Sequence, residues 1–143
     1  ITAALGCAAY AGIPLTLRSV AQQVTLVTAH CARSMDRLDW PLLAQARHTA
    51  VFYMGVGHAG LIEARLLAGG RDPATPVAII ERGTSADQRV TRTALAGLGD
   101  AVRAHQVQAP ALIVVGEVAA TDAAFAWFGT DTAKPADAMA VAA

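Results

Sequence analysis

The sequence has little charge of either sign and a single lysine, Lys134. Charged residues make up 15% of the 143 positions, the formal net charge at pH 7 is zero and the pI is about 7.1. Proteins that bind nucleic acid or a membrane surface usually carry a basic face. We therefore expect neither nucleic acid nor a membrane among the partners of this protein.

Long apolar runs and cysteines are also scarce. The best apolar run, residues 109–115, is far shorter than the roughly 18 residues that a membrane-spanning helix needs, and we find no signal-peptide pattern. Cys7 and Cys31 are too few for a disulfide framework, and we expect both to be buried or half-buried thiols in a reducing compartment. With 55% hydrophobic residues, the chain is expected to be a soluble, cytoplasmic, globular α/β protein. Its first residue, Ile1, indicates a fragment or a processed piece.

Hydrophobic periodicity predicts strands that alternate with helices. We expect strands at 20–30, 49–54, 76–81 and 111–118, a short edge strand at 88–93, and helices at 1–11, 40–47, 58–68 and 94–105. The strand at 20–30 is apolar enough to be buried on both faces, and Asp39 is placed to cap the second helix. The alternation predicts βα crossovers and a largely parallel sheet. Residues 129–143 have the low complexity of a disordered tail.

One local motif points to a nucleotide. Gly55, Gly57 and Gly60 follow a strand and open a helix, and Glu81 ends the next strand. In dinucleotide-binding turns such glycines allow a tight turn and a close approach to a pyrophosphate, while the acid binds a ribose hydroxyl. The alternative is a tight turn with chance glycines. It is favoured by the helix and strand that precede the motif and by the bulky Met54 before its first glycine.

Signatures of metal and nucleophile sites are weak. The four histidines are far apart in the sequence and no CxxC pair occurs, so we expect no metal site. The three serines lie in no GxSxG elbow. Small or apolar residues instead gather near the ends of the expected elements, at 2–3, 54–55, 81–84 and 110–112. Such loops suit a flat adenine and a thioether-like chain, and ordinary turns are the alternative.

Six segments carry a resemblance to a known family: GIPLT (12–16), VTLVTAH (24–30), LDWPLLA (38–44), VFYMG (51–55), ERGTSADQRV (81–90) and PALIVVGEV (110–118). In this order they resemble the C-terminal half of the uroporphyrinogen-III C-methyltransferases, which belong to the S-adenosylmethionine-dependent tetrapyrrole methylases. The resemblance covers residues 1 to about 128. It implies an α/β, tetrapyrrole methylase-like fold, in which the chain forms most of the second α/β domain of a two-domain protein and residues 1–11 are a helix from the inter-domain region.

The resemblance also implies an activity. The family transfers methyl groups from S-adenosylmethionine to uroporphyrinogen III, which gives precorrin-2 for sirohaem and cobalamin synthesis, and the implied assembly is a homodimer. Its cofactor contacts fall on these residues of this chain: Thr2, Ala3, Met54, Gly83 and, beside them, Pro110, Ala111 and Leu112. The proposed proton-transfer residues of the family belong to the first half, which the resemblance places outside this chain. We therefore expect no catalytic residue here and an inactive fragment, with Leu5, Cys7 and Tyr10 left as an exposed apolar surface.

The chain departs from the family at two places. Gly57 stands where relatives commonly have asparagine, so the second glycine of the nucleotide motif is not a family requirement. Leu17 and Ser19 replace a histidine and an aspartate, which puts in doubt any substrate or dimer contact made there. Arg18 between them is retained and is expected to pair with carboxylates of the substrate, with a surface ion pair as the alternative.

Three other functions stay open on the sequence alone. The first is another precorrin methyltransferase. The second is a dinucleotide-binding oxidoreductase domain built on Gly55, Gly57, Gly60 and Glu81. The third is a non-catalytic remnant that only dimerises.

Overall fold

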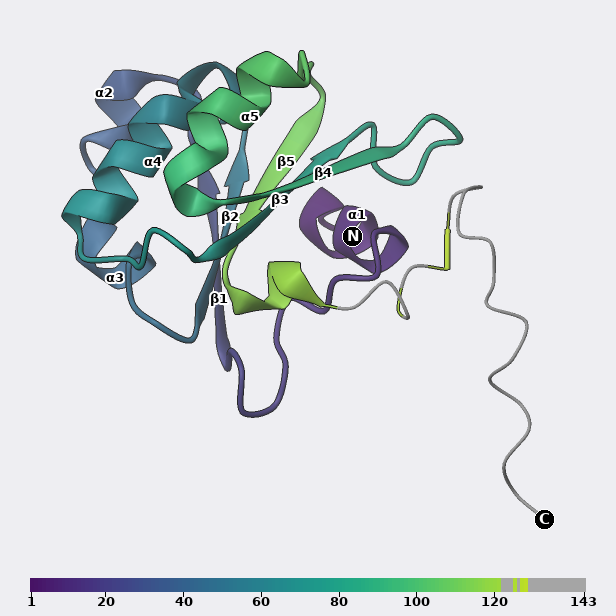
Figure 1. Cartoon of the computed structure of the whole chain (residues 1–143), viewed down its shortest axis with the longest axis horizontal. Coiled ribbons are helices and arrows are strands. Elements are labelled where there is room, and N and C mark those ends of the chain that lie inside the picture. The colour runs from purple at the N-terminus through teal and green to yellow at the C-terminus, as the bar shows by residue number, and fades with distance from the viewer. Residues whose placement is uncertain (122–124, 126, 129–143) are drawn as a thin grey trace.

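The computed structural model describes residues 1–121, 125 and 127–128 (Figure 1). In chain order its helices and strands are α1 (Ala3–Tyr10), β1 (Gln23–Thr28), α2 (Ala32–Met35), α3 (Trp40–Leu43), β2 (His48–Tyr53), α4 (Ala59–Ala68), β3 (Pro76–Glu81), β4 (Arg89–Ala94), α5 (Leu98–Ala104) and β5 (Ala111–Val115). The expected elements are present, and segment 31–39, expected as a loop, contains α2. Asp39 caps α3 as expected, because its carboxylate accepts a hydrogen bond from the Leu42 amide at 3.0 Å. The expected tail, 129–143, lies outside the described residues.

The described strands form a mixed sheet in the order β1-β2-β5-β3-β4. β1 and β2 are parallel, whereas β2 with β5, β5 with β3, and β3 with β4 are antiparallel. The prediction of a largely parallel sheet is therefore wrong. The predicted crossovers do exist: α4 joins β2 to β3 and α5 joins β4 to β5, and each joins two strands that run in the same direction. The two crossovers interleave. The strands that α4 joins, β2 and β3, have β5 between them, and the strands that α5 joins, β4 and β5, have β3 between them. In each case the strand in between runs in the opposite direction.

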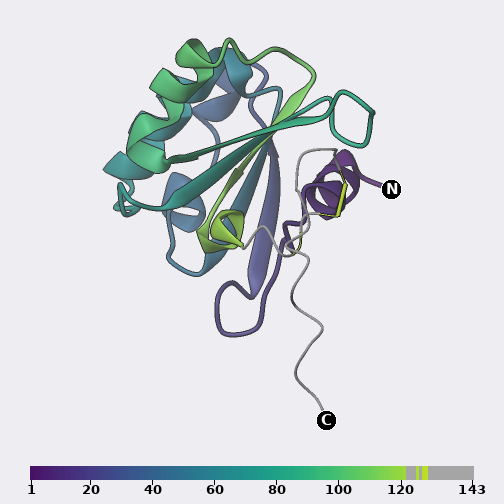
Figure 2. The same cartoon turned by 45° about the vertical axis from the view of Figure 1, so that its right-hand side comes forward.

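The central strands are buried on both faces by different helices. Phe52, Ile79 and Ile113 point toward one core, which α3, α4 and α5 cover. The alternate residues, among them Val51 and Ile80, point toward a second core, to which α1 contributes Ala4, Cys7 and Ala8. Figure 2 shows α1 on the opposite side of the sheet from α4 and α5. The fold thus has three layers. Successive side chains of a central strand point to opposite faces of the sheet, so each of these strands contributes to both cores.

β1 differs from the prediction because it is the edge strand of the sheet. Val24 and Leu26 are 38% and 44% exposed, so the strand is not buried on both faces. Their partners across the register are Thr49 and Val51 on β2. The apolar run in β1 was therefore a poor guide to burial, because position in the sheet decides how much of a strand is covered.

The predictions for the two cysteines and for the apolar surface of α1 also need correction. Cys31 is exposed at the start of α2, whereas Cys7 is buried beneath α1 as expected. Of the surface predicted on α1, Leu5 is exposed, but Cys7 packs into the second core. Tyr10 contacts the ring of Trp127 in a tilted arrangement, with centroids 4.8 Å apart. Part of that surface is therefore covered by this chain itself.

A buried arginine joins three segments of the chain at the end of the sheet where β2 begins. Arg71, 3% exposed, donates to both carboxylate oxygens of Glu117, at 3.1 and 3.0 Å. It also donates to the His48 carbonyl, to the Thr75 hydroxyl and to the Gln45 carbonyl. Burial lowers the pKa of Arg71, and the carboxylate of Glu117 opposes that shift. Since every partner is an oxygen, the guanidinium is well satisfied, and removing one strong acceptor carries a cost.

We predict that Glu117→Gln lowers the free energy of unfolding by about 1–3 kcal/mol, because a neutral amide replaces a charge-assisted bidentate partner of a buried cation. Asp36→Asn is the matched control. It weakens the Arg65–Asp36 pair, whose side chains are 45% and 61% exposed, and it should cost less than about 1 kcal/mol. Urea denaturation of both variants measures the difference, and equal effects would contradict the role assigned to Arg71.

Candidate cofactor site

One end of the sheet collects the ends of three neighbouring strands. β2 and β3 finish there, and the antiparallel β5 begins there, so that Tyr53 pairs with Leu112 and Ile80 pairs with the same Leu112. These three side chains face α1 rather than the other helices. The carboxyl ends of strands in open α/β sheets are where ligands bind, and the geometry places a floor of three apolar side chains under α1.

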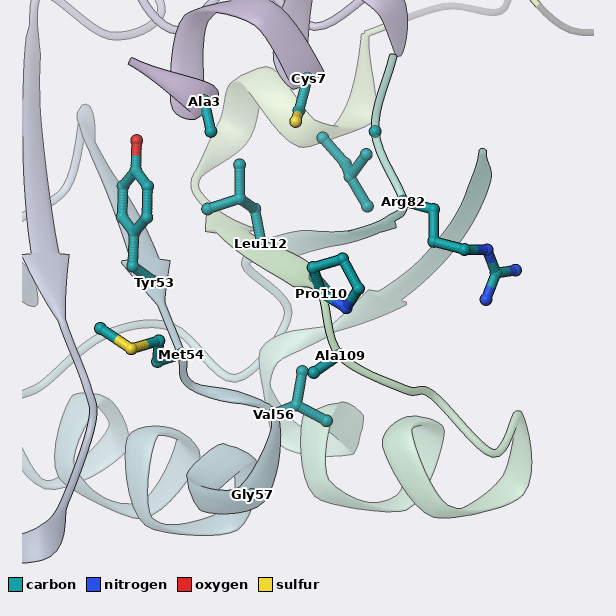
Figure 3. A pocket seen from close by; sticks show the side chains of 13 residues that line it. Ala3, Cys7, Tyr53, Met54, Val56, Gly57, Arg82, Ala109, Pro110 and Leu112 are labelled. Carbon is teal, nitrogen blue, oxygen red and sulfur yellow. The ribbon is translucent and has the colours of Figure 1, made fainter. Parts of the chain in front are cut away.

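A cavity of about 680 Å³ lies at this end of the sheet (Figure 3). Six of the seven predicted cofactor residues line it: Ala3, Met54, Gly83, Pro110, Ala111 and Leu112. Thr2 is not among the lining residues, but its hydroxyl pairs with the hydroxyl of Tyr53, which does line the cavity. Segments that are up to 109 residues apart in sequence are therefore brought to one place.

α1 forms one wall of the cavity because residue 83 has no side chain. A Cβ atom built on Gly83 would lie 2.6 Å from the Cβ of Cys7 and still nearer to its sulfur. Cβ atoms do not approach one another so closely, so any larger residue would push α1 away from the loop after β3. Gly83 thus has a packing role at this site that is independent of any ligand.

Two residues at strand ends adopt the left-handed backbone conformation. Met54, directly after β2, has φ 54°, and Arg82, directly after β3, has φ 46°. Such values are uncommon for residues other than glycine and cluster at functional sites. The Met54 side chain is 58% exposed at the rim of the cavity, and the chain turns sharply there toward Val56, which also lines it.

The charged groups near the cavity are paired away from it. Arg82 bonds Asp87 at 2.7 Å, and Figure 3 shows its side chain pointing away from the other lining residues. Glu81 is fully buried and accepts from Arg89 at 2.6 Å and from the Gln108 amide at 3.0 Å. Burial by itself would raise the pKa of Glu81, but these hydrogen bonds hold it below its ordinary value. The lining is therefore nearly neutral, and burial raises the pKa of the Cys7 thiol, which keeps it protonated.

The geometry does not favour the dinucleotide interpretation. Both carboxylate oxygens of Glu81 are engaged inside the protein, so the acid is not available to a ribose hydroxyl. Gly57 does line the cavity, but a Cβ atom built on it or on Gly60 would meet nothing within 4 Å. Neither glycine is thus required for close packing.

Arg18 is not brought to this cavity. It lies exposed in a tight turn closed by the Leu17 amide and the Ala21 carbonyl at 2.8 Å, just before β1. Because Gln23 at the start of β1 pairs with His48 at the start of β2, this turn lies at the opposite end of the sheet from Met54. The predicted substrate contact therefore finds no support at the cavity.

Sequence reasoning missed five of the thirteen lining residues: Cys7, Tyr53, Val56, Ile80 and Ala109. Gly57 and Arg82 also line the cavity and belong to segments that the sequence had singled out, the nucleotide motif and residues 81–84. Tyr53 and Ala109 are immediate neighbours of Met54 and Pro110, and this adjacency was a usable signal for them. Cys7 and Ile80 had no such signal, because only the docking of α1 on β3 brings them to the wall. In the part of the chain that the structure describes, no group of three potential metal ligands occurs and no helix is long and apolar enough to cross a membrane.

Comparison with known proteins decides the family. The model of the tetrapyrrole (corrin/porphyrin) methylases matches residues 1–99, which is more than half of the chain. The chain belongs to the tetrapyrrole methylase family. The resemblance seen in the sequence is thereby confirmed, and the cavity lies in a methylase fold.

Curated relatives of this methylase chain are much longer than it is. The siroheme synthase of Xylella fastidiosa is 52% identical over 130 residues, which cover 91% of this chain and 27% of the relative. Siroheme synthase 3 of Aeromonas hydrophila is 52% identical over 136 residues, which cover 95% and 29%. The chain thus spans less than a third of the length of these relatives.

Solved structures confirm the methylase fold. A uroporphyrin-III C-methyltransferase from Thermus thermophilus, complexed with S-adenosyl homocysteine, is 31% identical with a TM-score of 0.64, and the match covers 78% of this chain and 47% of that one. A cobalt precorrin-4 methyltransferase reaches a TM-score of 0.74 at 22% identity, over 85% of this chain and 51% of that one. The second likeness concerns the fold alone.

We predict that Gly83→Ala lowers the free energy of unfolding by about 1–3 kcal/mol, because the new methyl group collides with Cys7. Gly60→Ala is the control: its Cβ meets nothing within 4 Å, so the substitution inside α4 should be neutral or stabilising by up to about 1 kcal/mol. Adding Cys7→Gly should reduce the cost of Gly83→Ala, and a double-mutant cycle by urea denaturation measures this coupling. Additive effects would contradict the contact.

Proposed function

We propose that this chain supplies the cofactor-binding part of an S-adenosylmethionine-dependent methyltransferase that converts uroporphyrinogen III to precorrin-2. The observation that carries the proposal is the gathering of six predicted cofactor residues around one cavity in a chain of the methylase family. The relatives named siroheme synthase and the neighbour named uroporphyrin-III C-methyltransferase support the sirohaem branch of tetrapyrrole synthesis.

The cavity fits the cofactor in size and chemistry. Pockets for small molecules commonly measure about 300–1,000 Å³ and are mostly apolar, with a few polar groups that fix orientation. Here Met54, Ile80 and Leu112 provide apolar surface for an adenine ring, while Gly57, where a Cβ atom would meet nothing within 4 Å, leaves its backbone open to a ligand. The nearly neutral lining also suits a ligand whose sulfur is positively charged, since the cation in the lining, Arg82, is paired with Asp87 and directed away from the cavity.

The residues of this chain would act by position rather than by proton transfer. The bound cofactor would supply an activated methyl group on its sulfonium. The apolar floor of Ile80, Leu112 and the Tyr53 ring would exclude water, and the walls at Ala3 and Gly83 would fix the direction of the sulfur. Alignment of reacting atoms is worth up to about 7–11 kcal/mol in favourable cases, and a dry pocket protects the reactive sulfonium. Because the chain spans 47% of the Thermus neighbour, we expect turnover to need further sequence, so binding is the direct test.

We predict that residues 1–143 bind S-adenosylhomocysteine and not NAD. Titration calorimetry with each ligand decides between a methylase pocket and a dinucleotide site. Met54→Asp should weaken S-adenosylhomocysteine binding about 10-fold or more, because the bound ligand would desolvate the new charge. Ala46→Asp, an exposed position before β2 at the far end of the sheet, is the control and should bind normally. Micromolar NAD binding without S-adenosylhomocysteine binding would falsify the assignment.

We also propose that the protein forms a homodimer through the edge of β1. Gln23–Thr28 contains no charged residue and exposes Val24 and Leu26, whereas the other edge strand, β4, carries Arg89 and Arg92. Natural proteins protect free sheet edges with charge, so the unprotected edge is the one that supports pairing. A second copy fits because an uncharged strand meets no like charge when it pairs with itself across a two-fold axis.

Leu26→Lys should convert a dimer to a monomer in size-exclusion chromatography with light scattering, because it places a charge at the centre of the edge. Ala94→Lys on β4, also exposed, is the matched control and should leave the mass unchanged. Disruption by Leu5→Lys but not by Leu26→Lys would move the interface to the exposed face of α1, and a monomeric wild type would refute the dimer.

A further inference from the structure

The first turn of α1 has no cap of its own. Thr2 occupies the N-cap position, but its side chain makes no hydrogen bond to the backbone of the helix. The hydroxyl of Tyr53 takes that place, because it accepts a hydrogen bond from the Ala4 amide at 2.8 Å and pairs with the Thr2 hydroxyl. A side chain 49 residues away in sequence from Ala4 therefore satisfies an amide that a helix leaves without an internal partner.

Tyr53 is held where its hydroxyl must meet α1. It is the last residue of β2, pairs with Leu112 on β5, and its half-buried ring packs on the second core. Figure 3 shows the ring standing on the strand with its oxygen directed toward α1. Because the strand and its neighbours are rigid, the oxygen is a fixed reference point for the start of the helix.

The rest of α1 is anchored by other contacts. Cys7 lies against Gly83, and the Trp127 indole donates to the Ala9 carbonyl at 2.9 Å near the end of the helix. Neither contact reaches the first turn, where Ala3 lines the cavity and Thr2 precedes it. Ala4 of the first turn also packs in the second core, but among the described residues the Tyr53 hydroxyl makes the only side-chain hydrogen bonds to this turn.

We infer that Tyr53 is a positioning residue of the cofactor pocket, whose hydroxyl sets the place of the Thr2–Ala3 turn while its ring serves as part of the floor. The inference rests on the proposed function for the identity of the ligand. Its structural part, that the hydroxyl holds the first turn of α1, can be tested without any ligand.

The test uses Tyr53→Phe, which keeps the ring and removes the hydroxyl. Tyr10→Phe, at the other tyrosine of the chain, is the matched control on the same helix. Both are made in a Cys31→Ser background, since Cys31 is the exposed thiol and Cys7 the buried one. The rate at which a thiol reagent labels Cys7 then reports how often α1 opens, calorimetry gives the affinity for S-adenosylhomocysteine, and thermal melting reports global stability.

Tyr53→Phe should speed the labelling of Cys7 and weaken S-adenosylhomocysteine binding, each by about fivefold, the factor that corresponds to loss of one helix cap. Tyr10→Phe should change neither. A lower melting temperature with unchanged labelling and unchanged affinity would mean a merely structural hydroxyl and would overturn the inference. If the wild type binds no S-adenosylhomocysteine, the proposed function fails, and unchanged labelling of Cys7 in Tyr53→Phe would still refute the positioning role on its own.

Discussion

The cavity depends on how closely α1 can approach the loop that follows β3. Cys7 lies where a side chain on residue 83 would be, so the wall exists because Gly83 leaves room for it. That single contact sets the distance between a helix at the start of the chain and a strand end 76 residues later. It also buries Cys7, whose neutral thiol adds to the apolar wall. The ring of Tyr53 lies beneath the start of α1 and forms part of the cavity floor.

The interleaved crossovers explain why the floor is built from distant segments. In a simple parallel sheet, neighbouring strand ends come from consecutive βα units. Here β5 inserts between β2 and β3 in the opposite direction, so its first residues meet the last residues of both. Pro110 and Ala111 thereby reach the same end of the sheet as Met54 and Gly83. A strand that begins at this end can carry lining residues, just as the strands that finish there do.

The sequence predicted local structure better than arrangement. Period and turn residues located the strands closely, with β3 found at 76–81 as predicted, because those signals are local. The direction and order of the strands were predicted wrongly, because they depend on the insertion of β5 between β2 and β3, which is a contact between segments distant in the sequence. The exposure of Val24 and Leu26 was missed for a related reason: an apolar run does not reveal whether a strand is central or at the edge.

The site was predicted from small and apolar residues near element ends and from family resemblance, and not from a catalytic or metal-binding signature. No cluster of acids, histidines or serines marked it, and the structure explains why, because the lining is almost neutral. Small and apolar residues near the element ends had marked the segments that hold Thr2, Met54 and Gly83, and the family resemblance then selected these residues as cofactor contacts. Cys7 and Tyr53 escaped, because their roles arise from contacts between α1 and distant strands, and such contacts leave no trace in spacing along the chain.

Strong polar interactions in this protein are placed away from the cavity. Arg71 and Glu117 form their ion pair at the opposite end of the sheet. Both carboxylate oxygens of Glu81 accept hydrogen bonds inside the protein, one from Arg89 and one from the Gln108 amide. These pairs fix the strands whose ends form the site without placing charge inside it. Under the proposed function, a cavity of this kind would recognise its ligand through shape and backbone groups. Its selectivity would then depend on the positions of Ala3, Met54 and Gly83, so that small displacements of the backbone at these points would matter more than the loss of any one charged side chain.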